Sequence, residues 1–123
     1  MIATFTIMGE TVGLNEYINA ERTNRFMAAK IKKVEMGRIM QLLPDLKITH
    51  KIDITLSAFV KDKRKDPDNI YVMFLKFLLD AMVNMKIIPN DGQKQIGRII
   101  FEPIQIGEPR FEITTNPSPV SEL

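Results

Sequence analysis

The sequence predicts an α+β domain in which two main helices pack on one four-stranded mixed sheet. Three observations predict this class. The expected elements run strand, helix, strand, helix, strand, strand; apolar residues recur at spacings typical of each element; and 123 residues can form one hydrophobic core but not two. We expect a single domain over residues 1–115, followed by a flexible tail over residues 116–123.

The first half of the chain predicts a strand, a helix and a second strand. Residues 2–8 alternate between apolar and polar, as in a short strand, and the glycines of residues 9–15 predict a loop. Helical spacing over residues 19–43 predicts a helix that Pro44 ends. Alternation over residues 48–61 predicts a long strand with one buried face.

The second half predicts a helix and two closing strands. Residues 67–86 are apolar at helical spacing, and we expect the second main helix there. Residues 98–106 and 110–115 each predict a strand, and the turn-forming residues 107–109 between them predict a hairpin.

Composition excludes several classes of function. The chain has no cysteine, which rules out a disulfide framework, a thiol nucleophile and a thiolate zinc site. We expect no leader, no bilayer-spanning segment and a cytoplasmic location, because no apolar run approaches the roughly 20 residues that span a bilayer. The single histidine, His50, is expected to have a structural role at the margin of the sheet.

Cations cluster after the long strand, at Lys61, Lys63, Arg64 and Lys65, although the net charge of the chain is only +2. Such a patch is typical of surfaces that bind a polyanion. The alternative is an ordinary solvated surface.

Two interpretations of Asp66 and Asp68 remain open. In one, Asp66 is the N-cap of the helix, Pro67 is its first residue, and Asp68 faces the positive end of the helix dipole. In the other, these carboxylates join Asp91, in the turn Asn90-Asp91-Gly92, to form an oxygen-rich site for Mg²⁺, with Mn²⁺ as a substitute. Such an ion would activate a phosphodiester toward in-line attack.

Several motifs together resemble the RusA-like Holliday junction resolvases, in particular the branch found in phages and prophages of Gram-positive bacteria. The resemblance covers about residues 15–96. It is carried by Gly13-Leu14-Asn15-Glu16-Tyr17, Arg22, Lys30 to Lys33, Asp66-Pro67-Asp68-Asn69, Lys76, Asp80-Ala81-Met82 and Ile87-Ile88-Pro89-Asn90-Asp91-Gly92-Gln93.

The resemblance implies Mg²⁺-dependent cutting of four-way DNA junctions, during recombination and repair, by a homodimer. The family's essential carboxylates map onto Asp66, Asp68 and Asp91. This chain departs from the family at Asn90, where many members have an aspartate. It also departs at Val72, where many members have a lysine; Lys76 lies one turn further along and is assigned to phosphate charge or to the dimer interface.

Geometry independently suggests a second copy of the chain. A helix over residues 68–85 would be about 27 Å long, so Asp91 would lie far from Asp68 within one subunit. An antiparallel pair of these helices would place Asp91 of each chain near the aspartates of the other. The helix is apolar nearly all round, which favours a partner helix, but burial between the sheet and the first helix of the same chain is the alternative. Lys76 and Asp80 would form an ion pair within the helix or fix the register of the dimer.

The predicted function is therefore a crossover junction endodeoxyribonuclease with branched DNA as its partner and no small-molecule substrate or membrane partner. Recognition would depend on branched shape and phosphate position. The alternative functions are a non-catalytic DNA-binding or dimerisation module, whose aspartates only cap a helix, and a general phosphodiesterase. The expected DNA contacts are Lys63, Arg64, Lys65, Arg22, Arg25 and Lys30.

Overall fold

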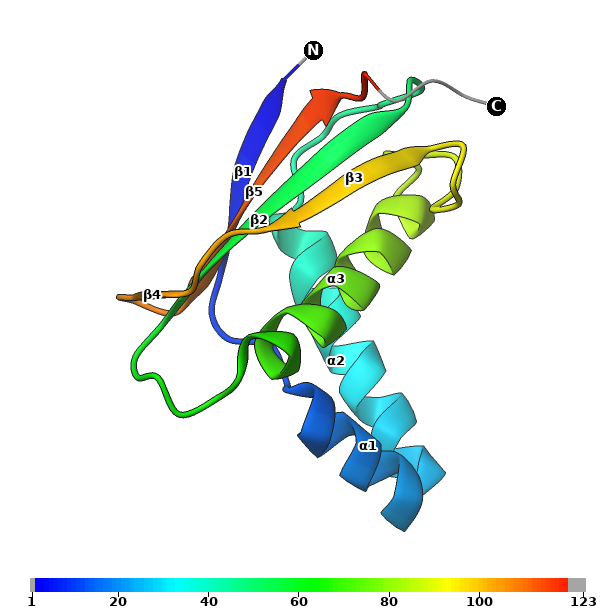
Figure 1. Cartoon of the computed structure of the whole chain (residues 1–123). Coiled ribbons are helices and arrows are strands. Elements are labelled where there is room, and N and C mark those ends of the chain that lie inside the picture. Colours follow the sequence, from blue (N-terminus) through cyan, green and yellow to red (C-terminus); the bar gives the residue numbers. More distant parts are fainter. Residues whose placement is uncertain (1, 120–123) are drawn as a thin grey trace.

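Within residues 2–119, which the computed structural model describes, five strands form a mixed sheet and three helices lie on one side of it (Figure 1). The elements are β1 (Ala3–Met8), α1 (Leu14–Thr23), α2 (Arg25–Leu42), β2 (Ile52–Val60), α3 (Pro67–Asn84), β3 (Ile96–Phe101), β4 (Gln105–Ile106) and β5 (Arg110–Pro117). The α+β class and the mixed sheet are confirmed. The expected four strands and two helices are not, because β4 is a separate short strand and the first helix is divided.

The sheet has the order β1-β5-β2-β3, with β4 pairing with β2 beyond the end of β3. β5 is antiparallel to both of its neighbours, whereas β3 and β4 are parallel to β2. The predicted hairpin between β4 and β5 is therefore wrong. β5 instead lies between β1 and β2, where Phe111 and Ile113 become buried. Burial on the core face outweighs the local preference of the turn for a hairpin.

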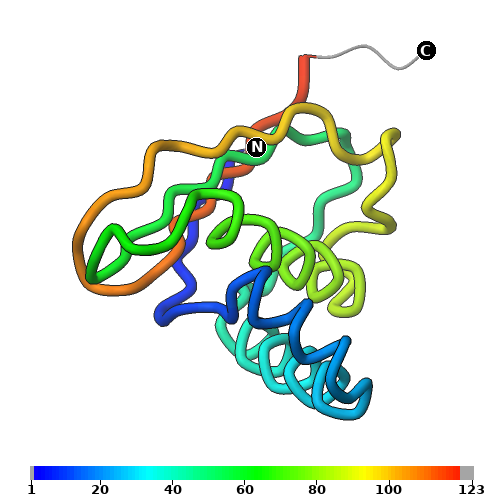
Figure 2. Tube along the Cα trace, turned by 60° about the horizontal axis from the view of Figure 1, so that its bottom comes forward, coloured from blue at the N-terminus to red at the C-terminus, as the bar shows by residue number. Residues whose placement is uncertain are grey.

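Asn24 divides the helix that was expected over residues 19–43. Its backbone is extended (φ −163°, ψ 113°), its N–H donates to the Ala20 carbonyl, and its Oδ1 accepts from the Phe26 N–H at 2.9 Å. One residue thus ends α1 and begins α2, as asparagine side chains often do at a helix start. α1 itself begins at Leu14, inside the expected loop. Figure 2 shows the two helices side by side as a hairpin.

β2 supplies the centre of the core. Ile52, Ile54 and Leu56 are fully buried on the face that contacts the helices, which confirms the alternation seen in the sequence. On the same face the rings of Phe74 and Phe111 stack with centroids 3.7 Å apart. His50 precedes the strand and is exposed, and its carbonyl accepts a hydrogen bond from Gln95.

Most of α3 is buried within a single chain. One side packs on the sheet, and the other contacts the helical hairpin, through Tyr17 against Phe77 and through an ion pair of Lys32 with Asp80 (3.7 Å). The apolar composition of the helix therefore does not by itself require a second copy. Asp80 was expected to pair with Lys76 but pairs with Lys32 of α2 instead, and Lys76 is exposed.

The chain after β5 remains attached to the sheet. Asn116 and Pro117, which were expected in the tail, belong to β5, and the Ser118 N–H donates to the Lys51 carbonyl at 2.9 Å. Residues 120–123 of the expected tail lie outside the described residues.

Tyr71→Phe is expected to destabilise the fold by about 1–3 kcal/mol, because a buried polar group would lose its partner. The Tyr71 hydroxyl accepts from the N–H of Ala58 in β2 (2.9 Å) and donates to the carbonyl of Glu102 (2.6 Å), in the segment between β3 and β4. Urea denaturation of Tyr71→Phe and of the control Tyr17→Phe would measure the effect. Equal stabilities of the two variants would show that the bridge contributes nothing.

Asp53→Asn is expected to destabilise the protein at pH 7 but not at low pH. The Arg98 N–H donates to Asp53 Oδ1 (2.7 Å), and this bond, with a second from the Ser118 side chain, lowers the pKa of Asp53. A lowered pKa stabilises the fold above the unfolded value of about 3.9, and that stability is lost as pH falls through the folded pKa. Urea denaturation at pH 7 and at low pH would measure the free energy of unfolding of the parent chain, of Asp53→Asn and of the exposed control Asp45→Asn. The difference between Asp53→Asn and the parent should shrink in acid, and no such change is expected for the control.

Candidate active site

Two helices begin side by side at one end of the molecule, and Asn69 ties them together. Its Oδ1 accepts from the Asn15 N–H in the first turn of α1 at 2.8 Å. A Cβ atom on the buried Gly13 would lie only 2.7 Å from Asn69 Nδ2, so a larger residue would displace the Asn69 amide that joins the two helix starts. The start of α1 is thus held against the start of α3, where the two aspartates lie.

A polar pocket of about 350 Å³ opens at this junction. Two of the three aspartates of the expected metal site reach this pocket, together with two of the expected DNA-binding cations. Its lining residues are Leu14, Asn15, Arg64, Lys65, Asp66, Asp68 and Asn69.

The helix cap does not use the Asp66 carboxylate. Asp66 stands at the N-cap position with an extended backbone, and its carbonyl accepts from the Ile70 N–H. Among the described residues, however, its side chain makes no capping hydrogen bond. Asp68 Oδ1 accepts from the Asn69 N–H at 2.8 Å, within the first turn. The helix start therefore explains why an aspartate carbonyl stands at position 66 and why one oxygen of Asp68 accepts a hydrogen bond. It gives no role to the carboxylate of Asp66.

Cations lie beside these carboxylates, on the exposed segment that leads into α3. Lys65 pairs with Glu16 of α1 at 3.3 Å, and Arg64 pairs with Asp62 at 3.7 Å. Exposed pairs of this kind contribute little energy and exchange readily for another anion. Arg64 and Lys65 are therefore available to a phosphate group held over the pocket.

Asp91 lies at the opposite end of α3 from the other two aspartates. The turn that carries it follows the helix (Figure 1). Within this turn, Asn90 Oδ1 accepts from the Gly92 N–H. The 18 residues of α3 span about 27 Å. Within residues 2–119, no group of three or more Asp, Glu, His or Cys side chains could hold a metal ion. The chain thus brings together Asp66 and Asp68 but not Asp91.

Asp66 and Asp68 suit Mg²⁺ as a two-carboxylate site. This ion prefers hard oxygen donors and is commonly held by one or two carboxylates, with water and substrate phosphate completing the shell. Both side chains are exposed and line one polar pocket. Soft-ligand metals are disfavoured, since the chain contains no cysteine.

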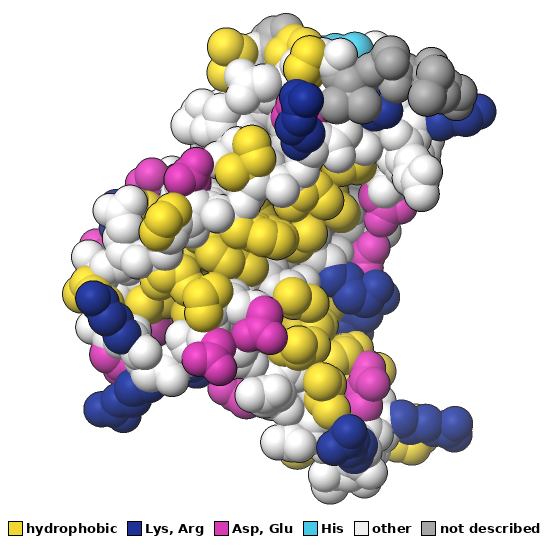
Figure 3. Space-filling view, viewed as in Figure 1, with side chains coloured by type: hydrophobic (Ala, Val, Ile, Leu, Met, Phe, Trp, Pro, Cys, Tyr) yellow, Lys and Arg dark blue, Asp and Glu magenta, His cyan; other side chains and the backbone are white. Residues whose placement is uncertain are grey.

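An apolar surface covers the outer side of α3 and the neighbouring edge strand β3 (Figure 3). Val72, Ile99 and Phe101 are each about two-fifths exposed, at 40%, 39% and 46%. Leu75 and Leu79, which follow Val72 along α3, add two half-buried side chains to this surface. We call this exposed apolar surface the α3–β3 face.

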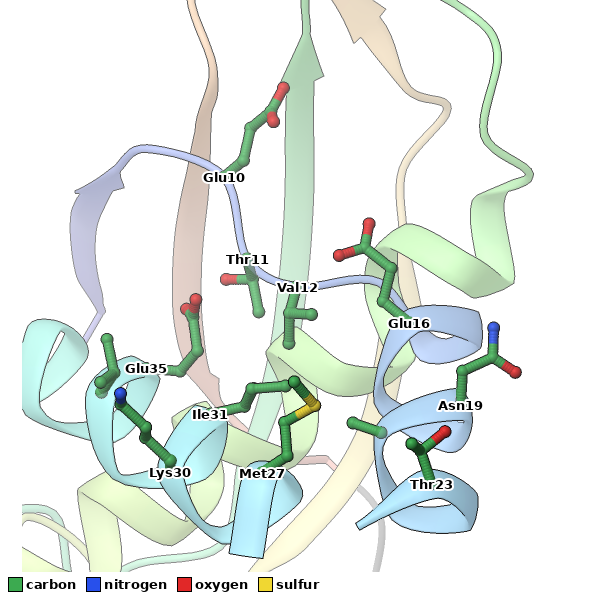
Figure 4. A pocket seen from close by; sticks show the side chains of 12 residues that line it. Glu10, Thr11, Val12, Glu16, Asn19, Thr23, Met27, Lys30, Ile31 and Glu35 are labelled. Atoms are coloured by element: carbon green, nitrogen blue, oxygen red, sulfur yellow. The ribbon is translucent and has the colours of Figure 1, made fainter.

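A wider hollow lies elsewhere, between the loop after β1 and the helical hairpin (Figure 4). It measures about 820 Å³ and has an apolar floor that includes Val12 and Ile31. The carboxylates of Glu10, Glu16 and Glu35 lie around it and would repel a phosphate backbone. A phosphate backbone therefore fits this hollow less well than the polar pocket, although Lys30 also lines the hollow.

The expected cations Arg22, Arg25 and Lys30 are exposed on the helical hairpin rather than at the pocket. Sequence analysis did not identify the tie between Asn15 and Asn69, although both lie within the motifs that carry the resemblance. Only the fold reveals that these motifs meet.

Comparison of the chain with protein-family models and with curated proteins gives no match. Among the described helices, none is both long and apolar enough to cross a membrane. The function is therefore inferred from the geometry of the pocket and from the motifs that surround it.

Proposed function

We propose that the chain is a Mg²⁺-dependent, structure-specific endonuclease that hydrolyses phosphodiester bonds in four-way DNA junctions. The observation that carries the proposal is the Asp66 carboxylate, which shares a polar pocket with Asp68 and is not used by the helix cap. The resemblance to RusA-like resolvases supports the same assignment, since it identifies the same two residues.

The residues at the pocket, and Lys76 outside it, have three roles in this proposal. Asp66 and Asp68 would hold Mg²⁺, which when bound supplies Lewis-acid stabilisation of charge on the phosphodiester. Arg64 and Lys65 hold the DNA backbone beside the carboxylates, so that a water molecule is aligned for in-line attack. Lys76 lies two turns further along α3, on its exposed side, and neutralises phosphate charge or contacts a partner chain.

A second copy of the chain would complete the site. The α3–β3 face gives the copy an apolar surface to cover, and a two-fold axis near the middle of α3 would set two such helices antiparallel. Since Asp91 lies beyond the end of the helix, its copy in the partner would approach Asp68. Two shared sites per dimer would suit a substrate that must be cut on two strands.

A cleavage assay on a synthetic four-way junction tests the proposal most directly. We expect paired cuts that require Mg²⁺ or Mn²⁺, with little cutting of a linear duplex of matching sequence. Binding should weaken steeply with added salt, because phosphate contacts dominate affinity. Equal cutting of both substrates would indicate a general phosphodiesterase. Binding with no metal-dependent cutting would indicate a non-catalytic DNA-binding module.

A further inference from the structure

The α1–α2 hairpin ends in a fixed tip with an exposed aromatic ring. Figures 1 and 2 show the hairpin extending away from the sheet, with the tip at its far end. Asn24 fixes the turn through its bonds to Ala20 and Phe26. The side chain of Phe26 is 73% exposed and that of the adjacent Met27 is 54% exposed. Phe26 and Met27 are adjacent, so the tip presents a small apolar surface to solvent.

Cations outnumber acids at the same tip, where Arg22 and Arg25 lie near the single acid Glu21. Residues 22–34 contain no acid, and Figure 3 shows basic side chains at the lower end of the molecule, where the tip lies. The Arg25 guanidinium lies 5.5 Å from the centre of the Phe26 ring, and Lys32 is engaged by Asp80. The remaining cations of this stretch, all exposed, are Arg22, Arg25, Lys30 and Lys33.

We infer that the hairpin tip is a wedge that stacks Phe26 against unpaired or unstacked bases of the DNA while the neighbouring cations hold the phosphates. Aromatic rings provide stacking platforms for bases, and apolar side chains such as phenylalanine and methionine insert between base steps. The inference rests on the proposed function, since that function makes branched DNA the substrate.

The tip lies within reach of DNA bound at the candidate active site. α1 begins at Leu14, which lines the polar pocket, and ends at Thr23 at the tip. Its ten residues span about 15 Å, the rise of four to five stacked bases. A strand held over Asp66 and Asp68 can therefore meet Phe26 as well. Base stacking is interrupted at the branch point of an open junction, whereas a linear duplex is stacked throughout, so the junction offers Phe26 an unstacked base face.

A second copy of the chain is a poor occupant of this surface. In a two-fold contact the same patch meets itself, so the arginines of one tip would lie against those of the other. Like charges placed together across an interface are costly. The charge favours a polyanion.

Phe26→Trp provides a direct test, because the chain contains no other tryptophan. In buffer without Mg²⁺, adding a four-way junction should quench the fluorescence of this single indole, and a linear duplex should quench it far less. Phe26→Ala should bind the junction roughly tenfold more weakly, as expected for the loss of one stacked base, and should bind the duplex almost unchanged. Val34→Ala is the matched control, since Val34 is 60% exposed on the same helix but away from the tip.

Unchanged junction affinity of Phe26→Ala, together with an unquenched indole in Phe26→Trp, would overturn the wedge. A change in the sedimenting mass of Phe26→Ala without DNA would also overturn it, since the ring would then contact another copy. These measurements involve no cutting. Quenching by the junction in a protein that never cuts DNA would support the wedge and reject the nuclease. Normal cutting and normal junction binding by Phe26→Ala would support the nuclease and reject the wedge.

Discussion

Asp68→Asn is expected to abolish Mg²⁺-dependent cutting of a four-way junction while leaving junction binding intact or tighter. The substitution keeps the shape of the side chain and its amide oxygen can still accept from the Asn69 N–H, so the start of α3 should be preserved. It removes the charge that would hold the metal. Metal stabilisation of the transition state contributes several kcal/mol, so the rate should fall by on the order of a thousandfold.

Asp62→Asn is the matched control for that experiment. Asp62 is an exposed acid on the same segment, and it pairs with Arg64 but does not line the polar pocket. Its substitution should leave the cutting rate within about twofold, as is usual when an exposed ion pair is lost. Cutting by Asp68→Asn at the rate of the parent chain would remove Asp68 from the mechanism and restore the capping interpretation.

Mixing two inactive variants, Asp68→Asn and Asp91→Asn, is expected to restore cutting. If each site combines Asp68 of one chain with Asp91 of the other, a mixed dimer contains one intact site and one doubly altered site. Random exchange gives mixed dimers in half of the population, so about a quarter of all sites should be intact. The product should be mainly nicked junction, since the second strand would stay uncut. A gel that separates nicked from fully resolved DNA measures both quantities.

The complementation needs chains that exchange, which a brief treatment with mild denaturant before mixing would promote. A mixture of Asp66→Asn with Asp68→Asn is the control, since both changes fall in the same half-site and no mixed dimer can contain an intact site. No activity in the first mixture, despite mixed dimers detected by mass, would show that Asp91 does not act across two chains. The proposed composition of the site would then have to be abandoned.

The local sequence determined the type of the main elements and the start of α3, but not the start of α1. Alternation in β2 placed Ile52, Ile54 and Leu56 on one buried face, as the structure confirms. Asp66 followed by Pro67 predicted the start of α3 to within a residue. Both predictions rest on interactions between residues close in the chain, namely side-chain periodicity and the fixed backbone geometry of proline. The sequence also placed Asp66 and Asp68 together, because two residues in one helical turn have little freedom to separate.

Tertiary structure decided what each element packs against and which polar groups remain free. Strand pairing is a competition among all edges of the sheet, so the turn before β5 could not reveal that this strand lies between β1 and β2. Likewise, α3 is covered by the helical hairpin of its own chain, a contact between residues far apart in sequence. The hydrogen bond from the Asn15 N–H to Asn69 Oδ1, which joins the starts of α1 and α3 beside Asp66, is likewise a contact between residues far apart in sequence. Long-range packing sets these contacts, and local pattern carries no information about them.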